Sequence, residues 1–207
     1  MTTHRLCRTL GSVVIAVAAL APSGCGTSAP STRAADTVSP SSLLVHVDDL
    51  PTGWRSSSSP GTDYRVTVCG VDLEPQAPEA VTSVRFAQSA LGPFLEEHVR
   101  VYDSGRTIED VAEELRAALR SCSSYAARGS DPASPTAHFS VEPLTVAGAP
   151  EDSVAWRQRP DGTVPITSDL LLVPHGDAAV LLMSYAIRDT PDPAVLARAA
   201  AALPAVQ

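Results

Sequence analysis

The chain of 207 residues contains no lysine, so all fifteen of its basic residues are arginine. None of its four cysteines belongs to a Cys-x-x-Cys motif, which leaves zinc-ribbon and thioredoxin-like chemistry with little support. The formal net charge is −8, and such a chain lacks the basic surface of a nucleic-acid-binding protein. No apolar run is long enough for a mature transmembrane helix.

Motifs that carry chemistry are also missing. There is no Gly-x-Ser-x-Gly elbow, no glycine-rich phosphate loop and no His-x-x-x-His pair, and Ser-x-x-Lys is impossible without lysine. We therefore expect neither a metal site nor a nucleotide cofactor. A hydrolase stays open as an alternative, because dispersed Ser, His and Asp residues can converge in space.

Acidic and histidine residues receive ordinary interpretations. The pairs Glu96-Glu97 and Glu113-Glu114 are interpreted as solvated faces, and the histidines as solvated or capping residues. The histidines that follow the first 25 residues are His46, His98, His138 and His175.

The first 24 residues have the pattern of a lipoprotein signal peptide. Arg5 and Arg8 precede a run of a dozen apolar residues, and small residues lead to Cys25. This arrangement resembles the lipobox of bacterial lipoproteins, in which the cysteine receives a diacylglycerol and becomes the new N-terminus. Pro22 departs from that pattern, because a leucine usually stands there; ordinary secretory cleavage nearby is the alternative.

Cleavage before Cys25 would remove two arginines and no acid, so the net charge of −8 would become −10. Anionic lipid repels such a domain, and we expect the acyl chain alone to hold it on the extracytoplasmic side of the cell membrane. Residues 25–40 are small, polar and rich in proline, and we expect them to form a flexible tether.

The remaining two cysteines are Cys69 and Cys122. In an oxidising exterior they have one possible intramolecular pairing, so we expect a disulfide; two separate buried thiols are the alternative.

Residues 107–122 give the strongest helix signal. Apolar residues recur there at three- and four-residue steps, Thr107 is suited to cap the first turn, and Cys122 lies on the apolar stripe. A first helix is expected over residues 43–50, ended by Pro51, with Trp54 as a core anchor. A closing helix is expected from about residue 190, and residues 123–127 are expected to be the end of the 107–122 helix.

Strands are predicted at 64–69, 80–90, 94–102, 138–146, 153–158, 164–174 and 178–188, with a loop over 56–61. The last strand is continuously apolar and is therefore placed at the centre of the sheet. Runs of strands without interleaved helices indicate an α+β fold, in which helices cover one face of an antiparallel sheet in a single domain over residues 41–207.

Trp156 and Arg157 are the candidate ligand-binding residues. A guanidinium beside an aromatic ring can contact an anionic or planar ligand, although a half-buried strand with a polar outer face gives the same pattern.

Residues 41–207 resemble the PknH-like extracellular sensor domains. The resemblance rests on Asp49-Leu-Pro-Thr-Gly-Trp54, on the stretch Leu115-Arg-Ala-Ala-Leu-Arg-Ser-Cys122, and on the order of strands and helices around them. It implies an antiparallel sheet packed by helices and a cleft that binds an unidentified ligand. Sensor domains of that family on kinases have two disulfides, whereas this domain can form one. The Mog1/PsbP-like fold shares the same plan.

From these observations we expect a lipid-anchored extracytoplasmic domain that binds a small-molecule or envelope ligand without catalysis. It would be attached to the membrane through the anchor, would not bind nucleic acid, and would be secreted if the lipobox is not used. A secreted hydrolase and a Mog1/PsbP-like protein-interaction lipoprotein are the alternatives.

Overall fold

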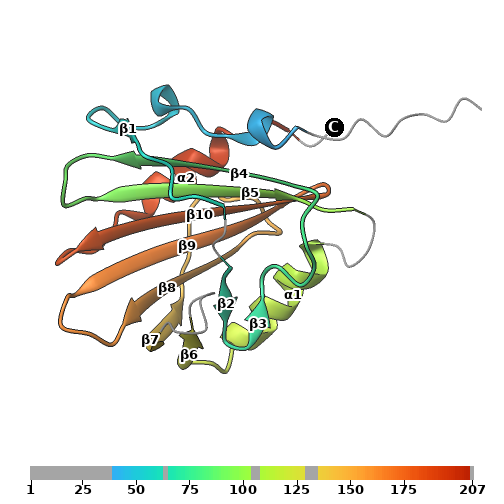
Figure 1. Cartoon of the computed structure of the whole chain (residues 1–207), viewed down its shortest axis with the longest axis vertical. Coiled ribbons are helices and arrows are strands. Elements are labelled where there is room, and N and C mark those ends of the chain that lie inside the picture. Colours follow the sequence, from blue (N-terminus) through green and yellow to red (C-terminus); the bar gives the residue numbers. More distant parts are fainter. Residues whose placement is uncertain (1–38, 63–64, 104–107, 129–134, 206–207) are drawn as a thin grey trace, which may run out of the picture. The chain divides into compact units, whose positions relative to one another are not determined.

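A computed structural model describes residues 39–62, 65–103, 108–128 and 135–205. Within these residues the chain forms one α+β domain, built on an antiparallel sheet of eight strands with a separate two-stranded hairpin (Figure 1). The predicted fold class is confirmed. Cys25, the leader and most of the tether lie outside the described residues.

The eight strands lie in an order that joins two meanders, with β5 beside β10 at the junction. Across the sheet they are β1 (Arg55–Ser57), β4 (Ala80–Ala87), β5 (Phe94–Val101), β10 (Ala178–Ile187), β9 (Ile166–His175), β8 (Val154–Pro160), β7 (Thr136–Pro143) and β6 (Ser124–Arg128). The predicted central position of the last strand is confirmed, since β10 lies between β5 and β9.

Both faces of the central strands are buried, and each face carries a helix. Leu170 and Leu172 of β9 pack with α1 (Ile108–Leu119), whereas Leu171 and Val173 pack with α2 (Pro193–Ala201). Alternate residues of a strand point to opposite faces, so α1 and α2 lie on opposite faces of the sheet. The expectation that the helices share one face is wrong, and the continuous apolarity of β9 and β10 follows from their burial on both sides.

Helix α1 buries the predicted apolar stripe, but it is shorter than expected. It ends at Leu119, and Cys122 follows in a turn. The backbone N–H of Cys122 donates to the carbonyl of Ala118. Thr107 lies outside the described residues. The expected helical end at 123–127 is instead strand β6, because Tyr125 and Ala127 are half-buried while the other residues of the strand are exposed, a period of two.

The disulfide between Cys69 and Cys122 is present, with 6.0 Å between its Cα atoms. Cys69 stands at the tip of the hairpin formed by β2 (Thr67–Val68) and β3 (Val71–Asp72). Both turn residues have positive φ, 54° at Cys69 and 84° at Gly70, which is the geometry of a tight two-residue hairpin turn. Cys69 therefore lies just beyond a strand end, although the strand is shorter than predicted.

The N-terminal segment differs from the helix expected over 43–50. It forms two short 3₁₀ turns, η1 (Pro40–Leu43) and η2 (Val47–Asp49), joined by extended backbone at Leu44 and His46. This path buries Leu43 and Val45 against the α2 face. Trp54 is buried in the same core, as predicted, and β1 begins directly after it. This strand takes in the first two residues of the loop expected over 56–61, and the rest of that stretch is irregular.

Candidate functional site

An open groove of about 450 Å³ lies on the α1 face of the sheet. In Figure 1, α1 and the β2–β3 hairpin lie over one end of the sheet. The groove residues lie on the same face of the sheet. Strands β4, β5, β10, β9, β8 and β7 all contribute to its floor, and Pro60 lies at its rim. The floor residues are Arg85, Glu96, Phe139, Gln158, Pro160, Ile166, Ser168, Met183 and Tyr185.

Strand register brings these residues together. Glu96 is paired directly with Arg85 of β4 and with Met183 of β10, and Ser168 of β9 is paired with Tyr185 and with Gln158. Directly paired residues point to the same face of a sheet, so one face collects them from distant parts of the chain. The same face carries Trp156, which is paired with Leu170 one step nearer to α1.

Glu96 is the centre of a charged network on the groove floor. Its Oε1 accepts hydrogen bonds from Arg85 Nε at 2.7 Å and from the Tyr185 hydroxyl at 2.9 Å, and its Oε2 lies 3.3 Å from Nε2 of His98. Burial raises the pKa of Glu96, but the hydrogen bonds from His98, Tyr185 and Arg85 outweigh it and leave the pKa below its usual value. The carboxylate is thus ionised beside a cationic guanidinium, and the pair is neutral overall.

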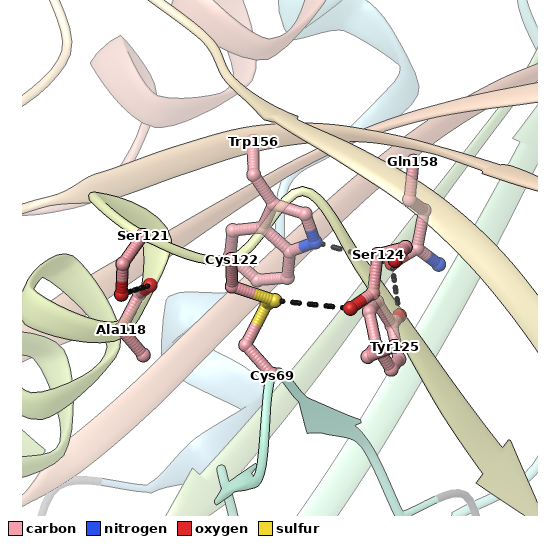
Figure 2. The surroundings of a disulfide bond; sticks show 8 residues. All are labelled: Cys69, Ala118, Ser121, Cys122, Ser124, Tyr125, Trp156 and Gln158. Carbon is pink, nitrogen blue, oxygen red and sulfur yellow. Dashed lines mark hydrogen bonds between the residues drawn. A yellow bond between two sulfur atoms is a disulfide. The ribbon is translucent and has the colours of Figure 1, made fainter.

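Gln158 is held in one orientation by two donors. Its Oε1 accepts from the indole N–H of Trp156 at 3.1 Å and from the hydroxyl of Tyr125 at 2.7 Å (Figure 2). An indole nitrogen can only donate, so it fixes which end of the amide is the oxygen. The amide NH₂ group is therefore the end directed away from these two donors, and it is available to a ligand in the groove.

Apolar and aromatic groups form the rest of the floor. Met183, Ile166 and Phe139 are half-buried, so each presents part of its surface to the groove. The ring of Phe139 stacks on that of Tyr125, with 5.1 Å between the ring centroids. The groove thus combines a rigid aromatic wall, a thioether and a small set of oriented polar groups, the usual composition of a small-molecule site.

The two residues proposed from the sequence are not brought together. Trp156 is fully buried on the α1 face and reaches the groove only through Gln158. Arg157 is on the opposite face, where its Nε and its terminal nitrogen donate to the two oxygens of Asp169 at 2.5 and 2.7 Å. These hydrogen bonds raise the pKa of Arg157, and Asp169 is fully buried, so the pair is a structural one.

The Glu96-Glu97 pair is not the solvated face that was predicted. Both residues are buried, and because they are neighbours on β5 they point to opposite faces of the sheet. His98 is also buried, contrary to expectation, as is His175, whose pKa is lowered by burial. Glu113 and Glu114 are exposed, as predicted.

Groups of three or more His, Cys, Asp or Glu side chains that could hold a metal ion are absent from the described part of the chain. None of the described helices is long and apolar enough to cross a membrane. The nearest thing to a catalytic arrangement is the Glu96–His98 pair, with Ser83 directly opposite His98 on β4. The Ser83 hydroxyl donates to the carbonyl of Gly61 at 2.9 Å, so its proton is not directed at the imidazole.

Sequence reasoning missed the groove residues because their role depends on register. Arg85 and Gln158 give no local signal, since polar residues alternating with apolar ones occur on any half-exposed strand. No protein-family model matches the chain, and no curated protein matches its sequence.

Proposed function

We propose that this protein is a lipid-anchored extracytoplasmic domain that binds a small molecule in the groove and does not catalyse a reaction. The observation that carries the proposal is the groove itself, about 450 Å³ in volume and lined from every strand between β4 and β7. That volume is within the range of small-molecule sites.

The charges of the groove indicate the class of ligand. The charged residues that line the groove are Arg85 and Glu96, and they neutralise each other. A ligand with a net charge would have to be desolvated without a counter-charge, which is costly. We therefore expect an uncharged or zwitterionic ligand with an apolar body for Met183 and Phe139 and an acceptor for the amide of Gln158.

The compartment is supported by two independent features. A disulfide between Cys69 and Cys122 persists in an oxidising exterior and is rare in a reducing cytosol. The leader and Cys25 have the pattern of a lipoprotein signal. Together they favour a domain that meets its ligand outside the cytoplasm.

Native mass spectrometry of the protein purified from its own envelope would test the proposal. We expect the unchanged protein and the variant Val164→Trp to carry the same small-molecule adduct, because Val164 is 51% exposed and does not line the groove. Ile166→Trp should lose the adduct, because the larger ring would fill the groove floor. Far-ultraviolet circular dichroism of both variants would verify that each is folded.

Three outcomes would contradict the proposal. An adduct that persists in Ile166→Trp would place the ligand elsewhere on the domain. Labelling of a single serine by an active-serine probe would favour the hydrolase. A protein partner that co-purifies stoichiometrically without any small molecule would favour the protein-interaction lipoprotein.

A further inference from the structure

Three polar side chains form a row across the floor of the groove. Gln158 of β8 is paired directly with Ser168 of β9, and Ser168 is paired in turn with Tyr185 of β10. Directly paired residues share a face of the sheet, and neighbouring strands lie about 4.8 Å apart. The row therefore presents an amide and two hydroxyls, side by side, to a ligand that crosses the strands.

The amide nitrogen of Gln158 and the hydroxyl of Ser168 are open to the groove. Neither group makes a hydrogen bond to another of the described residues, and neither is among the enclosed side-chain atoms that lack a partner. Both residues line the groove, so these two groups are reached by solvent there. The amide oxygen is already occupied by Trp156 and Tyr125, which leaves the NH₂ group as a donor to a ligand.

An apolar row lies beside the polar one. Phe139 of β7 is paired with Pro160 of β8, and Ile166 precedes Ser168 by two residues on β9, so it shares its face. All three apolar residues line the groove and are half-buried. The ring of Phe139 is supported from below by its stack on Tyr125. The floor thus has a polar side and an apolar side that follow the same direction across the strands.

The chemistry of a neutral sugar chain matches this division. A pyranose ring carries hydroxyls around its edge, which exchange hydrogen bonds with amides and hydroxyls, and C–H groups on its faces, which pack on the negative face of an aromatic ring. The groove is lined from six adjacent strands, which together span about 24 Å. That span suits a chain of several sugar units better than one compact metabolite.

Other neutral ligands fit the floor less well. An acyl chain would cover the polar row without pairing it, which is costly. An extended peptide binds by adding to the edge of a sheet, whereas the groove lies on its face. A charged glycan is disfavoured because the charges of Arg85 and Glu96 already neutralise each other.

We propose that the groove binds a short neutral oligosaccharide. Its hydroxyls pair with Gln158, Ser168 and Tyr185, and its C–H faces pack on Phe139 and Ile166. The inference rests on the function proposed above, because it concerns the same groove, and it adds the chemical class of the ligand.

The protein provides its own reporter for a test by nuclear magnetic resonance. The chain has two methionines, Met1 and Met183, and Met183 lines the groove. Carbon-13 labelling of the methionine methyl groups in the detergent-solubilised full chain follows the groove directly, and Met183→Leu identifies its signal. The probes are neutral glycan fragments released from the protein's own envelope and triacetylchitotriose. Deacetylated chitotriose, which has the same backbone but carries cationic amines, is the charged control.

We expect a neutral glycan to shift the Met183 signal saturably and to bind more tightly than the deacetylated control. Phe139→Leu should weaken this binding roughly fivefold, because the aromatic face is lost, whereas Phe139→Tyr keeps the ring and should bind as the unchanged protein does. Gln158→Glu should also weaken it roughly fivefold, because it removes the NH₂ donor and keeps an oxygen for its two donors. Arg159→Ala, from the next position of β8 and thus the opposite face, is the matched control.

The assignment of a glycan is overturned if no neutral probe moves the Met183 signal saturably, or if Phe139→Leu and Gln158→Glu both bind as tightly as the unchanged protein. Deacetylated chitotriose that binds as tightly as the acetylated form overturns it as well, as does a proline-rich peptide that shifts the signal when no glycan does. Native mass spectrometry separates this failure from that of the proposed function. An adduct that Ile166→Trp loses, but whose mass is not that of a glycan, overturns the glycan alone; absence of both adduct and shift overturns both.

Discussion

Replacing Glu97 by glutamine should abolish most of the loss of stability that the domain undergoes between pH 5 and pH 8. The Glu97 side chain is fully buried on the α2 face, where its Oε2 accepts the N–H of Val45 at 2.8 Å. Its Oε1 has no partner among the described residues. Burial raises the pKa of Glu97 to about 7; the Val45 hydrogen bond lowers it, and the charge of Asp49 raises it further.

The size of the effect follows from the difference between the folded and unfolded pKa. The ordinary value is 4.5, so between that pH and about 7 the folded domain keeps a proton that the unfolded chain has lost. Stability therefore falls as pH rises through this window, by about 2–3 kcal/mol between pH 5 and pH 8. Glutamine is uncharged throughout and keeps an oxygen for Val45, so Glu97→Gln should match the unchanged protein at pH 5 and exceed it at pH 8.

Urea unfolding of both proteins at pH 5 and pH 8 measures this effect. The change in unfolding free energy between the two pH values is compared for the unchanged protein and Glu97→Gln, so the titration of other groups cancels. Glu96→Gln is the matched control, because Glu96 is the neighbouring residue on the opposite face and its pKa is lowered. The stability that Glu96 contributes is present above its ordinary pKa and is lost only as pH falls through the lower folded value. If Glu97→Gln loses as much stability as the unchanged protein between pH 5 and pH 8, the reasoning is refuted.

Three further predictions concern the covalent links and a buried ion pair. Cys122→Ser should lower the unfolding free energy by about 4 kcal/mol on the chain-entropy account, given the 53-residue separation of the bridged cysteines; an unchanged urea midpoint would show that packing alone holds α1. Arg157→Ala should cost about 3–5 kcal/mol because it leaves the buried carboxylate of Asp169 unpaired, whereas Arg159→Ala, from an exposed pair, should cost less than about 1 kcal/mol in the same urea titration. Intact-mass measurement of membrane-extracted protein should show a chain that begins at an acylated Cys25; an unmodified N-terminus, or one at another residue, would contradict the anchor.

Local periodicity predicted the elements that bury a stripe or a whole strand. The apolar steps of α1 and the continuous apolarity of β10 are properties of short stretches, and the structure confirms both elements. The disulfide was predictable because only Cys69 and Cys122 remained once Cys7 and Cys25 were assigned to the leader and the lipid. Short elements escaped prediction because tertiary contacts decide them. The backbone N–H of Val45, for example, donates to the buried carboxyl group of Glu97, far along the chain.

The candidate site was not predictable for a related reason. Glu96 meets Tyr185 across 89 positions of sequence, and its contact with Arg85 depends on the register of a hairpin. A polar residue on a strand has the same local pattern whether it faces water, a groove or a buried partner. Consequently Glu96 and Glu97 look alike in the sequence, yet one is an ionised part of the groove and the other is a buried carboxyl on the opposite face.

The disulfide lies close to the residues that orient the polar groups of the groove. Cys69 and Cys122 pack against the cluster that contains Trp156, and the indole N–H of Trp156 holds the amide of Gln158 with its NH₂ group toward the groove. The covalent bridge therefore closes the α1 end of the sheet beside the residues that orient the groove's donor (Figure 2). The bond that is expected to stabilise the fold thus lies close to the residue whose indole N–H fixes the amide of Gln158.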